Sequence, residues 1–298
     1  NEEEETGLQS NIINKICGDK NGLLYMLCGY KHLVSYDKKN DTFRAINNKC
    51  QAISQGKKNL WYSVDNIIIQ YDFVKKTALN YYSVQPNFTV NTLFEASNGK
   101  LYIGTEAGLA MLDNKLFNMI IANNNITSIY EDSKNNIWVG TTENGVFKIN
   151  RNGLIDHYLS QDNGGLSSNI IRDFCEDNFG QIWIATFKGL DKIIPESNQI
   201  FNYKNYGNKP TDLSHTSIYS LYKDKQGTLW IGTYYGGINY YNPEANFYTY
   251  YYPAANNPKT INFPIVGKMV EDKDENLWIC TEGGGLNFYN RKTKLFQA

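Results

Sequence analysis

Short apolar stretches alternate with turn residues along the chain. In one representative segment, apolar residues gather at 126–131, 137–141, 146–149 and 154–159, and turns rich in Asp, Asn and Gly separate them. Alternating apolar and polar positions between such turns are typical of antiparallel β-hairpins. No segment shows the sustained 3.6-residue period of an amphipathic helix, so we expect few helices.

The hairpin pattern recurs around one aromatic anchor in each of seven repeats. Every Trp follows an aliphatic residue, and Tyr takes the same place twice, which gives Tyr25, Trp61, Tyr102, Trp138, Trp183, Trp230 and Trp278. The successive spacings are 36, 41, 36, 45, 47 and 48 residues. These periods fall in the range of four-stranded propeller blades. The expected repeats are approximately 7–46, 47–85, 86–120, 121–163, 164–210, 211–260 and 261–298.

Seven units of four short strands make a sheet too large to stay open without long exposed edges, and radial closure removes that problem. The sequence therefore predicts an all-β fold, a single seven-bladed β-propeller of four-stranded antiparallel blades over residues 1–298. We expect the first strand of each repeat to line a central channel and the anchors to pack between blades. Repeats 1 and 7 should close the ring by side-chain packing. A linear β-solenoid is the alternative, although its coils carry fewer hairpin turns.

Composition narrows the class of protein. The 298 residues carry a net charge of −1 and are 41% hydrophobic, and Tyr, Phe and Gly number 23, 14 and 24. The charge argues against a nucleic-acid binder, and the hydrophobic content against disorder. No apolar run approaches the roughly 18 residues of a membrane span, so no membrane contact is expected in this fragment. The Glu-rich start is not a secretion signal. The chain is therefore expected to be a cytoplasmic protein, an exported protein whose signal has been removed, or a fragment.

Catalytic and metal-binding patterns are missing from the sequence. It has no CxxC, G-x-S-x-G, H-E-x-x-H or P-loop, so we expect no catalytic residue, metal or cofactor. Residues 272–276 open like a calcium loop, but Leu277 stands where that loop needs Gly, so a tight turn with Asp as acceptor is expected. Adjacent carboxylates such as Glu131 and Asp132 should point to opposite sheet faces. The five Cys, at 17, 28, 50, 175 and 280, are expected to be small buried residues.

Two repeats carry a recognisable motif: Ser128 to Val146 contains Ile-Trp-Val-Gly-Thr, and Leu221 to Ile238 contains Leu-Trp-Ile-Gly-Thr. Together with the Gly-Gly-Leu-Ser-Ser-Asn linker at 164–169, they resemble the two-component regulator propeller repeat. The resemblance spans nearly the whole chain but weakens in repeats 1 to 3, where Ser63-Val64 and Leu27-Cys28 replace Gly-Thr.

That resemblance implies a fragment of a longer receptor. The family fills the periplasmic sensor regions of hybrid two-component systems in glycan-degrading Bacteroidetes. Such receptors hold two tandem propellers, an immunoglobulin-like domain, a membrane helix, a histidine kinase and a DNA-binding response regulator. By this resemblance the chain is expected to be a non-catalytic periplasmic sensor. Its partner would be an oligosaccharide or the neighbouring propeller, and the full receptor would be a homodimer. The alternatives are a propeller enzyme, such as a polysaccharide lyase using His157 or His215, and a pure scaffold.

The longer spacings of the second half suggest where a ligand would bind. Most added residues fall in the crossovers at 160–164, 205–210 and 253–259, and insertions on one face of a repeat array usually mark its working face. The turns between second and third strands share that face. The predicted ligand-binding residues are Phe187, Lys188, Tyr234, Tyr235 and Glu282 in those turns, with Arg172 and Lys268 at the channel mouth, where repeat 4 has Thr and Ser. Aromatic rings suit sugar faces, and the charged groups suit hydroxyls or carboxylates.

Overall fold

The computed structural model describes residues 8, 10–18, 22–84, 88–113, 116–161, 164–205, 212–242 and 247–298; for residues 247–249 it describes the backbone only. These residues form seven antiparallel sheets, each of four strands in chain order. None of the described residues lies in an α-helix, so none forms a helix that could cross a membrane.

The first four sheets span residues 13–158. Blade 1 holds β1 (Ile13–Gly18), β2 (Leu23–Cys28), β3 (His32–Asp37) and β4 (Thr42–Asn47). Blade 2 holds β5 (Cys50–Gln55), β6 (Asn59–Val64), β7 (Ile67–Asp72) and β8 (Thr77–Ser83). Blade 3 holds β9 (Val90–Glu95), β10 (Leu101–Thr105), β11 (Gly108–Asp113) and β12 (Leu116–Ala122). Blade 4 holds β13 (Ile126–Glu131), β14 (Ile137–Thr141), β15 (Val146–Ile149) and β16 (Ile155–Tyr158).

Three further sheets complete the set. Blade 5 holds β17 (Ile171–Glu176), β18 (Ile182–Thr186), β19 (Gly189–Ile194) and β20 (Gln199–Tyr203). Blade 6 holds β21 (Ile218–Lys223), β22 (Leu229–Thr233), β23 (Ile238–Asn242) and β24 (Phe247–Tyr251). Blade 7 holds β25 (Val266–Glu271), β26 (Leu277–Thr281), β27 (Gly285–Asn290) and β28 (Leu295–Gln297).

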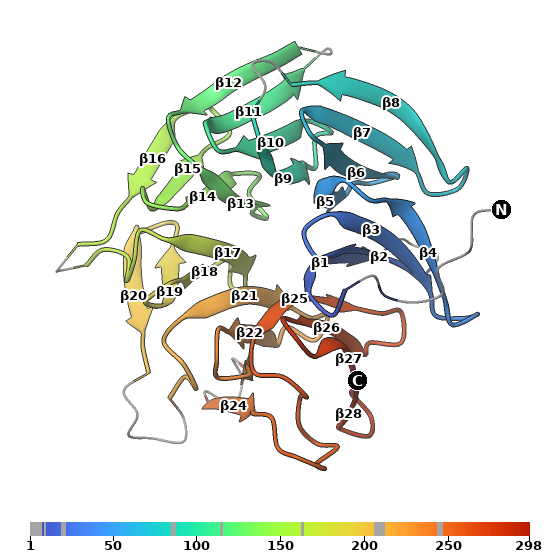
Figure 1. The fold of residues 1–298 in the computed structure, drawn as a ribbon. Coiled ribbons are helices and arrows are strands. Elements are labelled where there is room, and N and C mark those ends of the chain that lie inside the picture. The colour runs from blue at the N-terminus through green and yellow to red at the C-terminus, as the bar shows by residue number, and fades with distance from the viewer. Residues whose placement is uncertain are drawn as a thin grey trace.

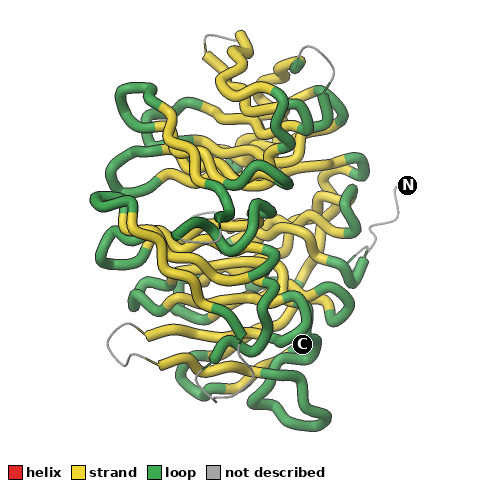
Figure 2. The backbone as a smooth tube through the Cα atoms, turned by 90° about the vertical axis from the view of Figure 1, so that its left-hand side faces the viewer, coloured by secondary structure: helices red, strands yellow, loops and turns green. Residues whose placement is uncertain are grey.

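The seven sheets are arranged radially around a centre (Figure 1), which confirms the predicted seven-bladed propeller. The first strand of each blade is innermost and contacts the first strands of its neighbours, and β25 contacts β1 to complete the circle. Seen from the side, the turns lie on the two faces of this disc (Figure 2). Because each strand order is contiguous, no blade borrows a strand from another.

The aromatic anchors pack between blades, as predicted. Trp138 and Trp183 are 0% and 1% exposed, and Trp138 shares a core cluster with Ile171 and Phe174 of blade 5. Trp278 packs in the same way against Ile13 of blade 1, so the ring closes by side-chain packing.

The Asp-containing turns are structural, as the sequence indicated. Oδ1 of Asp132 accepts the backbone N–H groups of Lys134 (3.0 Å) and Asn136 (2.8 Å), while Oδ2 accepts the indole N–H of Trp138 at 2.8 Å. Asp177, Asp224 and Asp272 repeat this arrangement. The residues from 272 to 276 thus form a hairpin turn, and no cluster of three or more potential metal ligands occurs in the described part of the chain.

The adjacent carboxylates have separate partners, as predicted from their alternation. Asp132 bonds within its own blade, whereas Glu131 accepts from the backbone N–H and hydroxyl of Ser97 in blade 3, at 2.6 and 2.7 Å. Glu176 accepts in the same way from Ser133 of blade 4. All five cysteines are buried free thiols, which also matches the sequence reading.

The lengthened crossovers have a structural role that the sequence did not reveal. Each of the last three buries one aliphatic side chain, namely Leu166, Leu213 or Ile261. A polar residue of the third strand forms hydrogen bonds to each crossover. In blade 5, for example, Asp191 accepts the Ser167 backbone N–H at 2.7 Å and the Ser167 hydroxyl at 2.6 Å. Added length on this face therefore partly serves packing. The predicted loop positions 162–163 and 206–210 lie outside the described residues.

Candidate functional site

A cavity of about 330 Å³ opens at the mouth of the central channel. It lies on the face where the crossovers enter the inner strands and where the second-to-third turns emerge. Its polar and aromatic lining comes from five blades and consists of Asn14, Tyr30, Thr127, Arg172, Tyr219, Lys268 and Glu282. Inner strands and turns of blades 1, 4, 5, 6 and 7 thus converge on one concave site.

Arg172 is held between two aromatic rings. Its guanidinium carbon lies 4.4 Å from the centroid of Tyr219 and 5.3 Å from that of Phe187. One guanidinium N–H group donates to Ser217 Oγ at 2.8 Å, and a weaker bond at 3.2 Å reaches a backbone carbonyl of blade 6. Burial lowers the Arg172 pKa, while nearby Tyr219 and Glu282 favour the cation. The arginine is therefore fixed as a positive, partly desolvated platform.

Tyr219 links the arginine to the opposite wall of the cavity. Burial, together with the charge and a hydrogen bond of Glu282, raises the Tyr219 pKa to about 12. The hydroxyl therefore stays protonated at neutral pH and lies close enough to the Glu282 carboxylate to respond to its charge. The ring of Tyr219 stacks on Tyr234, with centroids 5.9 Å apart and planes 21° apart.

Four aromatic rings lie together beside the cavity, and we name them the aromatic ledge: Phe187, Tyr219, Tyr234 and Tyr235. Tyr219 is half-buried, and the Arg172 guanidinium lies between it and Phe187. Tyr235 follows Tyr234 with a centroid separation of 6.1 Å. Phe187, Tyr234 and Tyr235 are 45%, 43% and 56% exposed. Large rings left open to solvent beside a polar cavity are suited to stacking against a flat, partly apolar ligand surface.

An ionic cluster extends from the cavity into the channel. Lys268 Nζ lies 2.6 Å from Asp173 Oδ2, which also accepts the Leu221 backbone N–H at 2.9 Å. Lys15 follows Asn14 on β1 and is within electrostatic range of both Lys268 and Asp173. Burial, followed by repulsion from Lys268, lowers the Lys15 pKa to about 8.

The structure gathers six of the seven predicted residues in one region. Arg172, Lys268 and Glu282 line the cavity. Phe187 and Tyr234 adjoin it through Arg172 and Tyr219, and Tyr235 extends the ledge. Lys188 shares the Phe187 turn, but its side chain is exposed and does not line the cavity.

Sequence reasoning missed six residues of the site: Asn14, Tyr30, Thr127, Tyr219, Lys15 and Asp173. A signal for three of them exists in the inner strands. When the seven first strands are aligned, Arg172 and Tyr219 share the second position, and Lys15, Asp173 and Lys268 share the third. Since those strands surround the channel, outliers in one column must face a common space.

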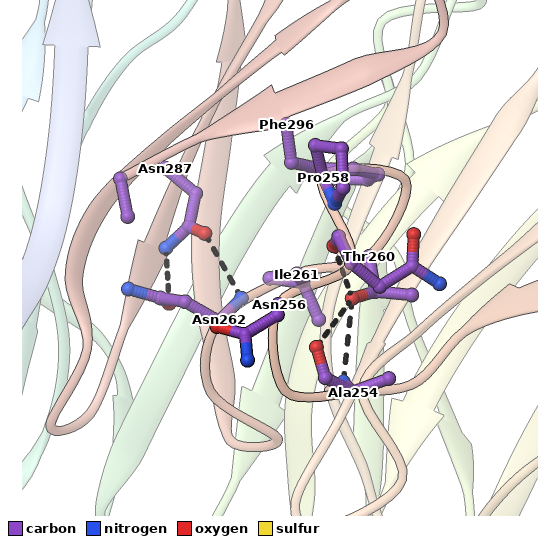
Figure 3. Close-up of a pocket in the computed structure, with 10 residues that line it drawn as sticks. Ala254, Asn256, Pro258, Thr260, Ile261, Asn262, Asn287 and Phe296 are labelled. Carbon is purple, nitrogen blue, oxygen red and sulfur yellow. Dashed lines mark hydrogen bonds between the residues drawn. The ribbon is translucent and has the colours of Figure 1, made fainter.

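A second cavity, of about 480 Å³, lies at the crossover from blade 6 to blade 7 (Figure 3). Its polar groups are already paired with one another: Asn287 Nδ2 donates to Asn262 Oδ1 at 2.7 Å, and the Thr260 hydroxyl is 2.9 Å from the Asn257 carbonyl. It lacks charged and exposed aromatic groups, so the smaller cavity is the stronger candidate despite its size.

The two histidines considered for catalysis differ in position. His157 lies on the outer strand β16, stacks on Phe147 with centroids 4.0 Å apart, and bonds to the Asn144 carbonyl. His215 lies nearer the candidate site: its Nδ1 accepts the Ser217 backbone N–H at 3.0 Å, and its ring is 6.5 Å from that of Tyr234. Only His215 is placed beside the ledge.

Comparison with known families identifies the repeats. The two-component regulator propeller model matches residues 120–143, 165–188 and 212–235. Three segments of the chain thus match the two-component regulator propeller repeat. They lie in blades 4, 5 and 6 and in the crossovers that enter them, where the sequence motif is also clearest. Comparison with curated proteins gives no match.

Solved structures share the fold of this propeller at low sequence identity. The extracellular domain of BT3049 from B. thetaiotaomicron, described as a hybrid two component system, aligns with a TM-score of 0.78 and 20% identity over 95% of this chain. The chain spans 40% of that structure. Virginiamycin B lyase from Staphylococcus aureus aligns at 0.72 and 13% identity, over 93% of this chain and 94% of that one. PorZ of Porphyromonas gingivalis aligns at 0.71 and 14% identity, over 94% and 46%.

Proposed function

We propose that this propeller is the non-catalytic sensor module of a hybrid two-component receptor, and that it binds an oligosaccharide at the channel mouth. The observation that carries the proposal is the aromatic ledge beside a charged cavity. Sugar rings present one flat apolar face and an equatorial belt of hydroxyls. The exposed rings of Tyr234 and Tyr235 fit the face, and the Glu282 carboxylate and the amide of Asn14 fit the hydroxyls.

The comparisons support the class of receptor. The BT3049 structure is an extracellular domain of a hybrid two-component system and has the same propeller over most of this chain. By analogy this propeller lies outside the cytoplasmic membrane, in the periplasm, and signals through a histidine kinase elsewhere in the receptor. The neighbouring propeller of the receptor is the alternative partner for the ledge, and the full receptor would be a homodimer.

A propeller lyase is the second candidate, and two observations favour it: the fold match with virginiamycin B lyase and the place of His215 beside Tyr234. A lyase needs a general base aimed at a substrate proton. The test is to incubate the protein with a uronate-containing polysaccharide and measure the unsaturated product. Product formation by wild type that is lost in His215→Ala would establish the lyase instead of the sensor.

Calorimetry on this chain tests saccharide binding directly. Short neutral and acidic oligosaccharides serve as the panel, with wild type and the Tyr234→Ala/Tyr235→Ala variant compared. Loss of the two stacking surfaces should weaken any bound oligosaccharide at least about tenfold. In the receptor that carries this chain, the same substitutions should abolish the sugar-induced signal.

Tyr81→Ala provides the matched control, because Tyr81 is an exposed tyrosine on the outer strand β8, away from the channel. It should leave binding unchanged. Equal affinity of the ledge variant and wild type, or no binding of any saccharide in the panel, would overturn the proposed site. The latter outcome would favour a scaffold whose ledge contacts protein.

A further inference from the structure

The charge around the channel mouth is not balanced. Two carboxylates, Asp173 and Glu282, face three cationic side chains, Arg172, Lys268 and Lys15. Lys268 is paired with Asp173 at 2.6 Å. Arg172 is near Glu282 and also donates to Ser217. One positive charge therefore remains, and it belongs to Lys15.

Lys15 has an unusual environment for an ammonium group. It is half-buried on the inner strand β1, and no ion pair among the described residues includes it. The ionisable groups that face it are Lys268 of β25, Asp173 of β17, Cys50 of β5 and Cys17 of its own strand. Burying an ammonium without a counter-ion is costly, and a nearby second ammonium adds to the cost.

The position of the excess charge relates it to the cavity. Lys15 and Lys268 hold the third position of the adjacent inner strands β1 and β25, and Lys268 lines the cavity. A ligand group that passes from the aromatic ledge into the cavity therefore reaches Lys268 and its partner Asp173 first, with Lys15 on the neighbouring strand. An anionic ligand group at that point would supply the missing counter-charge.

We propose that the channel beneath the cavity receives a carboxylate or sulfate group, so that the ligand is an acidic saccharide held by Lys15 and Lys268. This inference rests on the proposed function, because the ledge must bind the sugar ring for the anion to reach the lysines. It adds the ligand class: a uronate-containing or sulfated oligosaccharide in preference to its neutral counterpart.

The test compares three probes of equal length by calorimetry: a neutral oligosaccharide, its uronate counterpart and its sulfated counterpart. Wild type should bind one of the acidic probes at least about tenfold more tightly than the neutral one. Lys15→Met should remove most of that preference while keeping the neutral affinity. Lys188→Met, which removes an exposed lysine of the same face outside the cavity, should keep the preference. The uronate and sulfate arms identify which anion is bound.

A second variant guards against misfolding. Lys268→Met alone would leave Asp173 without its cationic partner, so Lys268→Met/Asp173→Asn removes both charges together. It should also reduce the preference for the acidic probe.

A change of pH provides an independent readout. Between about pH 7 and about pH 9, Lys15 loses its proton, since its pKa is lowered to about 8. The affinity for the acidic probe should therefore fall more than the affinity for the neutral one.

The outcomes separate this inference from the proposed function. Binding of neutral and acidic probes with equal affinity, reduced alike in the Tyr234→Ala/Tyr235→Ala variant, would overturn the acidic ligand and leave the saccharide site standing. An acidic preference that survives in both Lys15→Met and Lys268→Met/Asp173→Asn would also overturn it. Failure of all three probes to bind would overturn both proposals.

Discussion

At the scale of single residues, one carboxylate organises each well-formed hairpin of the propeller. Asp177 is buried and uses Oδ1 for the amide groups of its turn and Oδ2 for the indole of Trp183, at 2.9 Å. The indole then packs in a cluster with Ile218 and Leu221 of the next blade. The turn, the anchor and the blade junction therefore depend on one another.

Substitution of Trp183 should expose this dependence. Trp183→Ala leaves a cavity at the junction of blades 5 and 6 and removes the donor to Asp177, so the free energy of unfolding should fall by about 3–5 kcal/mol. Trp183→Phe keeps most of the packing and should cost less. Urea denaturation followed by circular dichroism measures both, and equal stability of Trp183→Ala and wild type would contradict the anchor role.

At the scale of elements, the crossovers are fastened to the blades they enter. Asp191 of β19 is fully buried and accepts from Ser167 and from Asn202 Nδ2 at 2.7 Å. Burial raises the pKa of the Asp191 carboxyl, although these bonds oppose the shift. In blade 6, Asn239 binds the same two groups of Ser214: its Oδ1 accepts the backbone N–H at 3.0 Å, and its Nδ2 donates to the hydroxyl at 2.7 Å, the reverse of the hydroxyl bond in blade 5. An uncharged amide can therefore hold a crossover as the Asp191 carboxylate does.

The comparison between blades gives a direct prediction for Asp191. Asp191→Asn should stay within about 1 kcal/mol of wild type, because the amide can make the two bonds that Asn239 makes to its serine and avoids a buried charge, while the Asn202 amide turns over to present its oxygen to the new NH2 group. Asp191→Ala removes both acceptors of Ser167 and one of the two acceptors of Asn202, and should lower the free energy of unfolding by about 2–3 kcal/mol.

The stability difference between Asp191→Asn and wild type should also depend on pH. A raised carboxyl pKa means that ionisation at neutral pH costs the folded state stability, and protonation at lower pH restores it. Any advantage of Asp191→Asn over wild type should therefore be largest near pH 7 and shrink as the pH falls. An advantage that grows on acidification would contradict the buried-charge explanation.

At the scale of the whole molecule, seven inner strands bring distant residues to one axis. The junction of blades 7 and 1 is closed by a shared core around Trp278 and by Lys38, whose ammonium lies 2.8 Å from Asp272 and over the ring of Phe288. The channel mouth is the other product of closure, since it joins strands from opposite ends of the chain.

Closing the ring also buries the Lys15 ammonium group, and the resulting loss of folding stability can be measured. Because its pKa is lowered to about 8, the charged form destabilises the fold below that pH, and the penalty is relieved as the pH rises from about 8 towards the ordinary value. Lys15→Met should stabilise the protein by about 1–2 kcal/mol near pH 7, after allowance for solvent screening. The gain should diminish near pH 9 in urea denaturation. A less stable variant near pH 7 would contradict the account.

Much of this architecture could be predicted from the sequence, because its determinants are local. Each hairpin consists of strands joined by short turns, and the aliphatic–aromatic pair at Ile137-Trp138 or Leu229-Trp230 repeats with every blade. The same spacing gave the number of blades, and the position of turns within a blade gave the face on which Phe187, Tyr234 and Glu282 lie. These features need only the period of the chain and the alternation of its strands.

Tertiary structure alone decided which of those residues meet. Tyr219 is an ordinary strand tyrosine in the sequence, yet the packed blades stack it on Arg172 and bring it within electrostatic reach of Glu282 of another blade. Lys15 and Asp173 lie far apart in the chain and share a site only because their strands surround one channel. The crossover lengths did not show that Leu166 and Ser167 would be bound to blade 5. Local patterns specify each blade, whereas the site depends on contacts between blades, and those exist only after the ring has closed.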